Sequence, residues 1–117
     1  MSIPNYSSAH CHIQSFDSAS TPEAFAEREI ELGTGTLTTT DHGTMGACRK
    51  VYDIARKNDL TPIVGMEAYF RDDTDGILRE HGIKDVKAYE KYFHLTMHCL
   101  DAEAFGFLSQ KLSAARL

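Results

Sequence analysis

Short β-rich runs alternate with helical stretches along the chain, and this alternation is the feature that most restricts the fold. The β-rich runs are 6–13, 34–40, 60–70 and 92–100. Helical patterns cover 22–32, 45–58 and 101–117, and a polar loop covers 71–91. Strands joined by helices favour a parallel sheet with the helices packed outside it. The sequence therefore predicts an α/β fold with about four strands of the parallel type.

Two of the helical stretches carry local signals of their own. Thr21 precedes Pro22, which is the arrangement of a helix N-terminus, and Gly33 is placed to end the same helix. In the second stretch, Val51 and Ala55 recur at helical spacing, which predicts the buried side of that helix.

Composition and charge exclude several classes of protein. The 117 residues suffice for one small domain, and 42% apolar with 25% charged residues argues against disorder. No apolar run reaches membrane-spanning length and the first residues do not form a signal peptide, so a cytoplasmic protein is expected. Three widely spaced cysteines, Cys11, Cys48 and Cys99, argue against a disulfide framework. A formal charge of −5 disfavours a stand-alone nucleic-acid-binding module.

His10 and His12 lie two residues apart in the first β-rich run. On a strand this spacing places both imidazoles on one face, where they can reach a single metal ion. By itself the pair is a weak indication, because most such histidines are surface or core residues. Further residues of the right chemical type occur near the ends of later runs or in a loop: Asp17, His42, Glu67 and His94. Imidazoles mixed with carboxylates suit Zn, Mn or Fe rather than Ca or Mg.

Glu67 gives the strongest single-residue argument outside the histidine pair. It lies in the apolar run Gly65-Met66-Glu67-Ala68-Tyr69-Phe70, and burying a carboxylate is unfavourable unless it is paired or bound to metal. Its two oxygens can bridge two ions. Asp41 is expected to orient an imidazole, with capping of the following turn or helix an equally open alternative. Gly43 and Gly65 are expected to let the backbone pass close to the site.

Other polar groups have plainer explanations. The aspartates at 72, 73 and 75 lack the glutamate that an EF-hand loop requires, so a calcium loop is rejected. His98 shares a face with His94 but lies about 13 Å further along a strand, which favours a wall residue over a ligand. A basic edge on the second helix is expected to be a solvated face, although some of these cations and Arg71 are candidates for phosphate contact. The edge consists of Arg49, Lys50, Arg56 and Lys57.

Four stretches and one loop residue together carry a family resemblance. They are Ala9-His10-Cys11-His12, Asp17, Thr39-Thr40-Asp41-His42-Gly43, residues 62–69 and Phe93-His94-Leu95-Thr96. In combination they resemble the PHP (polymerase and histidinol phosphatase) domain at the start of bacterial replicative DNA polymerase III alpha subunits. The polymerase branch fits better than the phosphatase branch, because the runs around Glu67 and His94 resemble its versions.

The resemblance implies a fold and a set of ligands. The fold is a partial PHP-type (β/α)7 barrel, with residues 1–117 forming the N-terminal portion of the family domain. The family holds up to three ions, of which fewer are expected here, because its later ligands lie beyond residue 117. Six positions match the family's ligands: His10, His12, Asp17, His42, Glu67 and His94. Asp17 matches if its loop is two residues shorter than in the family.

Carried over residue by residue, the resemblance also implies how these ligands are shared. The pair His10 and His12 would hold one ion together with Glu67. Glu67 and His94 would begin a second site, and Asp17 and His42 a third.

The resemblance also implies a function. It is a metal-dependent phosphoesterase acting as a 3′→5′ proofreading exonuclease, with Glu67 and His12 as the residues expected to carry catalysis. DNA 3′ ends are the expected substrate, no membrane is involved, and a polymerase subunit or second chain is expected to complete the barrel. Two alternatives stay open: a non-catalytic module that stabilises or docks a polymerase, and a small-molecule phosphatase of the histidinol-phosphate type.

Overall fold

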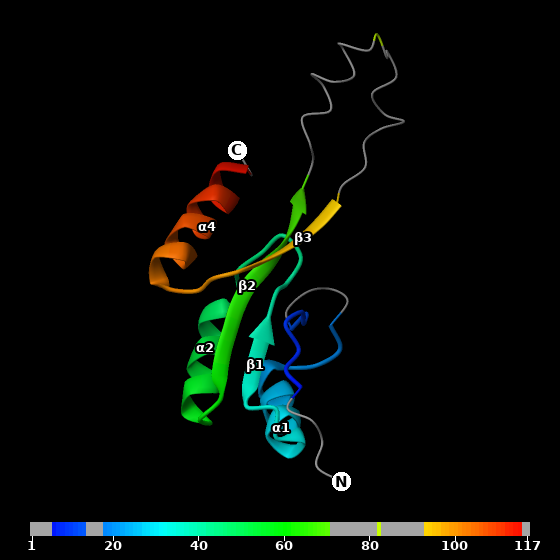
Figure 1. The fold of residues 1–117 in the computed structure, drawn as a ribbon, viewed down its shortest axis with the longest axis vertical. Coiled ribbons are helices and arrows are strands. Elements are labelled where there is room, and N and C mark those ends of the chain that lie inside the picture. Colours follow the sequence, from blue (N-terminus) through cyan, green and yellow to red (C-terminus); the bar gives the residue numbers. More distant parts are fainter. Residues whose placement is uncertain (1–5, 14–17, 71–81, 83–92, 116–117) are drawn as a thin grey trace.

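The structure is a computed structural model that describes residues 6–13, 18–70, 82 and 93–115. Its helices and strands are, in chain order, α1 (Pro22–Leu32), β1 (Thr36–Thr39), α2 (Cys48–Lys57), β2 (Thr61–Phe70), β3 (Phe93–His98) and α4 (Ala102–Ala115). Figure 1 shows the helices beside a narrow sheet, so the predicted α/β class is confirmed. The predicted loop at 71–91 lies outside the described residues, apart from position 82.

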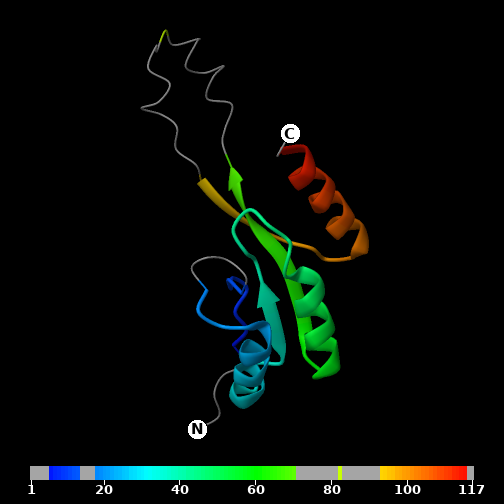
Figure 2. The same ribbon diagram turned by 180° about the vertical axis from the view of Figure 1, so that it is seen from behind.

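The sheet is mixed, and this corrects the prediction of strands that all run parallel. Its order is β1-β2-β3. β1 pairs with β2 in parallel, with Thr36 opposite Thr61, whereas β2 pairs with β3 antiparallel, with Glu67 opposite Thr96. A helix, α2, connects the parallel pair, as a parallel connection requires, and β3 instead runs back along β2 (Figure 2). The partial (β/α)7 barrel is not established by this sheet and stays a prediction.

The first predicted strand is also corrected, because residues 6–13 form an extended segment without regular strand pairing. The segment lies along the end of β1, where Thr40 donates its backbone amide to the Cys11 carbonyl at 2.8 Å. Most of its other bonds run to side chains: the Cys11 amide donates to Thr40 Oγ1 (3.1 Å), and Thr38 Oγ1 donates to the Ser8 carbonyl (2.6 Å). Hydrogen bonds to side-chain hydroxyl groups thus take the place of the backbone hydrogen bonds that a regular strand would form.

The helix boundaries follow from the signals in the sequence. Thr21 Oγ1 accepts the Ala24 amide at the start of α1, and Gly33 ends the helix with φ +67°. α2 begins at Cys48, later than predicted, and buries Val51 and Ala55 as expected.

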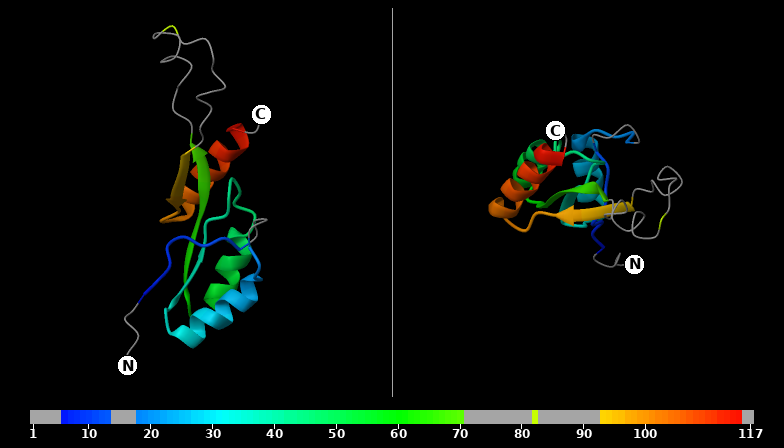
Figure 3. Two further views of the ribbon diagram at one scale, coloured as in Figure 1. Left: turned by 90° about the vertical axis from the view of Figure 1, so that its right-hand side faces the viewer. Right: turned by 90° about the horizontal axis from the view of Figure 1, so that it is seen from above.

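The core lies on one face of the sheet and the candidate site on the other. α2 packs on β1 and β2, and Val64 of β2 packs against the buried cluster that includes Leu37 and Val51. Side chains alternate along a strand, so Glu67 points away from this core. Figure 3 shows segment 6–13 crossing the strands, and its last residue, Ile13, joins the buried core cluster. At Gly65 a Cβ would lie 2.0 Å from the Met97 carbonyl oxygen, which confirms the expected close approach of backbone there.

Within the described ranges, no helix has both the length and the apolar character needed to cross a bilayer.

Replacing Leu37 by alanine tests whether this small core holds the sheet to α2. Leu37 is fully buried, so we expect Leu37→Ala to lower the free energy of unfolding by about 2–5 kcal/mol. The matched control is Leu100→Ala, because Leu100 is 92% exposed and its loss should change stability by less than about 0.5 kcal/mol. Urea unfolding of both variants measures the difference. Equal effects of the two substitutions would contradict the assignment of the core.

Candidate metal centre

Glu67 is the centre of a cluster of histidines. Its side chain projects from the middle of β2, and the residue is only 4% exposed. Its Oε2 lies 2.7 Å from His10 Nε2 and 2.8 Å from His12 Nε2. Its Oε1 is hydrogen-bonded to His94 Nδ1, and His42 Nδ1 lies 3.5 Å from Oε2. One buried carboxylate therefore collects four imidazoles from three separate parts of the chain.

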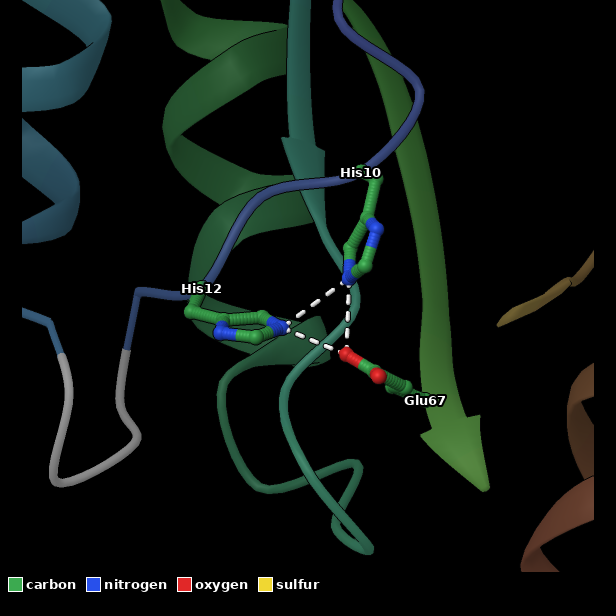
Figure 4. A group of neighbouring side chains, drawn as sticks. All are labelled: His10, His12 and Glu67. Carbon is green, nitrogen blue, oxygen red and sulfur yellow. Dashed lines mark hydrogen bonds and ion pairs between the residues drawn. The ribbon is translucent and has the colours of Figure 1, made fainter. Parts of the chain in front are cut away.

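His10, His12 and Glu67 form the first ligand group (Figure 4). Their nearest atoms make a triangle, because the two Nε2 atoms are also only 3.0 Å apart. Three electron-pair donors at these distances need a proton or a cation between them. A tetrahedral site with metal–ligand bonds of 2.0–2.1 Å separates its ligand atoms by about 3.3 Å. The residues therefore fit a divalent ion after a small outward movement.

His42, Glu67 and His94 form the second ligand group. Backbone pairing places His42, which forms an isolated parallel bridge with Glu67 beyond the end of β1. The Gly43 amide donates to the Glu67 carbonyl (2.8 Å), and the Glu67 amide donates to the Asp41 carbonyl (3.1 Å). The two groups touch each other, since the His12 and His42 ring centroids are 4.2 Å apart.

Hydrogen bonds with the side chains of Asp41 and His98 hold the segment that carries His10 and His12 in place. The buried Asp41 accepts the Ile13 amide at 2.6 Å through Oδ1 and the Thr39 hydroxyl at 3.1 Å through Oδ2. His98 Nε2 donates to the Ala9 carbonyl at 2.6 Å. The backbone on both sides of the histidine pair is thus fixed to the sheet. That Asp41 also orients an imidazole stays a prediction.

The histidines keep the Glu67 carboxylate ionised. Burial raises the pKa of this carboxyl, but hydrogen bonds with His10, His12 and His94 and the charge of His42 outweigh burial and lower the pKa to about 2. Glu67 is therefore an anion at neutral pH, as a metal ligand must be.

The structure brings together five of the six predicted ligands: His10, His12, His42, Glu67 and His94. The sixth, Asp17, lies outside the described residues. The grouping differs in one respect from that implied by the resemblance, because His42 lies with Glu67 and His94 rather than apart from them. The roles of these residues in binding metal, and of Glu67 and His12 in catalysis, stay predictions.

Sequence reasoning missed two residues at the site. Tyr69 contacts the rings of His42 and His94, and its signal is that it follows Glu67 by two residues on the same face of β2. His98 was expected to be only a wall residue, and it holds the backbone next to His10.

Comparison with known proteins places these residues in a family context. The model of the PHP domain matches residues 8–117. The DNA polymerase III subunit alpha of Helicobacter pylori is 29% identical over 117 residues, which cover 97% of this chain and 9% of that protein. The PolC-type DNA polymerase III of Thermotoga petrophila is 29% identical over 99 residues, covering 84% of this chain and 7% of that protein. The chain thus spans less than a tenth of the length of these curated relatives. No solved structure gives a significant match.

The lowered pKa of Glu67 predicts how acid destabilises the metal-free chain. The folded state holds this carboxyl at a pKa of about 2 against an ordinary 4.5, so the stabilisation is present above pH 4.5 and is lost as pH falls toward 2. At about 1.4 kcal/mol per pH unit the full loss is about 3 kcal/mol. Unfolding experiments across this window should show a shallower pH dependence in Glu67→Gln.

The control for this measurement is Glu31→Gln, because the Glu31 side chain is 66% exposed on α1. It should keep the pH dependence of the parent chain. If Glu67→Gln also keeps it, the histidines do not stabilise the charged form of Glu67.

Proposed function

The chain belongs to the PHP family, and on that premise we propose that it is a metal-dependent phosphoesterase domain of a DNA polymerase III alpha-like protein. The reaction is hydrolysis of phosphodiesters at the 3′ ends of DNA, in the 3′→5′ direction. The observation that carries the proposal is the convergence of four imidazoles on the Glu67 carboxylate. The relatives support the polymerase context, because both are DNA polymerase III proteins.

Each of the two ligand groups would hold one cation. His10 and His12 would bind one Zn, Mn or Fe ion through Nε2, together with Oε2 of Glu67. His42 and His94 would bind a second ion with the same carboxylate. Bound divalent ions of this kind lower the pKa of a water and stabilise the leaving oxygen in phosphoester hydrolysis.

Residues of the chain hold the proposed ligands in place before substrate binds. Glu67 remains ionised and contributes an oxygen to each ligand group. Asp41 holds the backbone beside His12, so that the imidazole does not have to be positioned when substrate arrives. Asp17 is proposed as a further metal ligand, and fewer than three ions are expected in this chain.

The expected partners follow from the same context. We propose that a polymerase subunit or a second chain completes the barrel around the site. We also propose that the protein acts in the cytoplasm, where DNA is replicated in bacteria.

Metal content of the 117-residue chain is the first test. Elemental analysis after exposure to Zn, Mn or Fe and removal of free metal should find at least one ion per chain. His12→Ala should weaken binding by more than the roughly 10–100-fold that loss of a ligand-orienting group causes. Glu31→Gln should retain the parental metal content. A parent chain that binds none of the three metals would contradict the proposal.

Substrate choice is the second test. When DNA carries a label at its 5′ end, the metal-loaded chain should remove nucleotides from the 3′ terminus, so that the labelled strand becomes shorter. Glu67→Gln should abolish this activity, because both ligand groups lose their shared carboxylate. Turnover of phosphomonoesters without shortening of DNA would favour the small-molecule phosphatase instead. Metal that raises the unfolding temperature without any hydrolysis would favour the structural module.

A further inference from the structure

Tyr69 contacts both imidazoles of the second ligand group. It follows Glu67 by two residues on β2 and is the cross-strand partner of His94. Its ring lies almost parallel to that of His42, with centroids 5.9 Å apart and an interplanar angle of 8°. It meets the His94 ring edge-on, at 5.2 Å and 81°. Offset stacking and edge-to-face contact are the two favourable arrangements of aromatic pairs.

A glycine makes room for this ring. Gly43 follows His42 and has φ +58°, and a Cβ there would lie 3.1 Å from Cε2 of Tyr69. The Gly43 amide also donates to the Glu67 carbonyl, so the turn that carries His42 is fixed to β2 close to Tyr69. The backbone at this turn is therefore shaped to let the Tyr69 ring lie against the imidazole.

We propose that Tyr69 is a positioning residue that fixes the ring orientations of His42 and His94 and thereby sets the affinity of the second ligand group for a divalent cation. The affinity part rests on the proposed function, because it requires this group to bind metal. The orientation part concerns the metal-free chain alone. Groups that orient ligand side chains alter metal affinity by about 10–100-fold when removed.

The neighbouring residue provides a matched control. Tyr69 is 51% exposed and Phe70 is 49% exposed, so the two aromatic rings are equally open to solvent. They lie on opposite faces of β2, because successive side chains alternate. Tyr69→Leu and Phe70→Leu therefore remove similar rings, and only the first removes one from the histidines. Tyr69→Phe keeps the ring and tests rescue.

Ring signals of the histidines in the metal-free chain test the orientation. In NMR spectra recorded with a chelator, Tyr69→Leu should weaken or change the nuclear Overhauser contacts between the His42 and His94 rings, whose centroids are 5.1 Å apart, because the ring that holds both imidazoles in place is lost. Tyr69→Phe and Phe70→Leu should leave these contacts close to those of the parent chain. Unchanged contacts between the two rings in Tyr69→Leu, with the fold intact by circular dichroism, would overturn the proposal.

Zinc titration by calorimetry tests the affinity. In a His10→Ala background, which disables the first group, Tyr69→Leu should weaken Zn²⁺ binding by about tenfold or more, with recovery in Tyr69→Phe and no change in Phe70→Leu. Equal Zn²⁺ affinity with and without the Tyr69 ring would overturn the affinity part. If the His10→Ala chain itself binds no Zn²⁺, the second group is no metal site and the affinity part falls with it. The NMR result then still decides whether Tyr69 orients the rings.

Discussion

A charged carboxylate buried in the middle of a strand is the constraint on which the rest of this structure depends. Glu67 lies between apolar neighbours, and a buried charge without partners would be strongly destabilising. Its partners come from a segment more than fifty residues earlier, from the turn after β1 and from the adjacent strand β3. Pairing this single side chain therefore requires segment 6–13, the turn after β1 and strand β3 to meet at β2.

The alternation of side chains along β2 separates this polar cluster from the apolar core. Val64 faces α2 and the cluster of buried residues around Leu37 and Val51. Glu67 and Tyr69 face the histidines. A shift of one residue in the strand register would turn Glu67 into the core and Val64 toward the imidazoles. Core packing and assembly of the site thus select the same register, and each reinforces the other.

The sequence predicted the helices and the faces of the strands better than it predicted how the strands pair. The cap at Thr21 and the stop at Gly33 are local signals, and both operate as expected. The direction of β3 and the irregularity of segment 6–13 were missed, since a period of two identifies a face but neither a partner nor a direction. The hydroxyls that replace a ladder there, such as that of Thr40, also suit an ordinary strand. The convergence of histidines on Glu67 follows from their places near strand ends. The signal for Tyr69, its spacing of two from Glu67, is weaker, because an aromatic residue is common in any strand.

The bonds that hold this site together fall into two sets. Hydrogen bonds between imidazoles and Glu67 link the side chains of the cluster, and the same ring nitrogens would have to give up their protons to bind a metal. The backbone beneath them is fixed separately, by Asp41 on the amide of Ile13 and by His98 on the carbonyl of Ala9. Binding of a cation by His10, His12 and Glu67 would displace these protons and widen their triangle of atoms by a few tenths of an ångström, while the backbone bonds could stay as they are. The proposed role of Tyr69 fits this arrangement, because its ring contacts the ligand side chains and not the backbone that carries them.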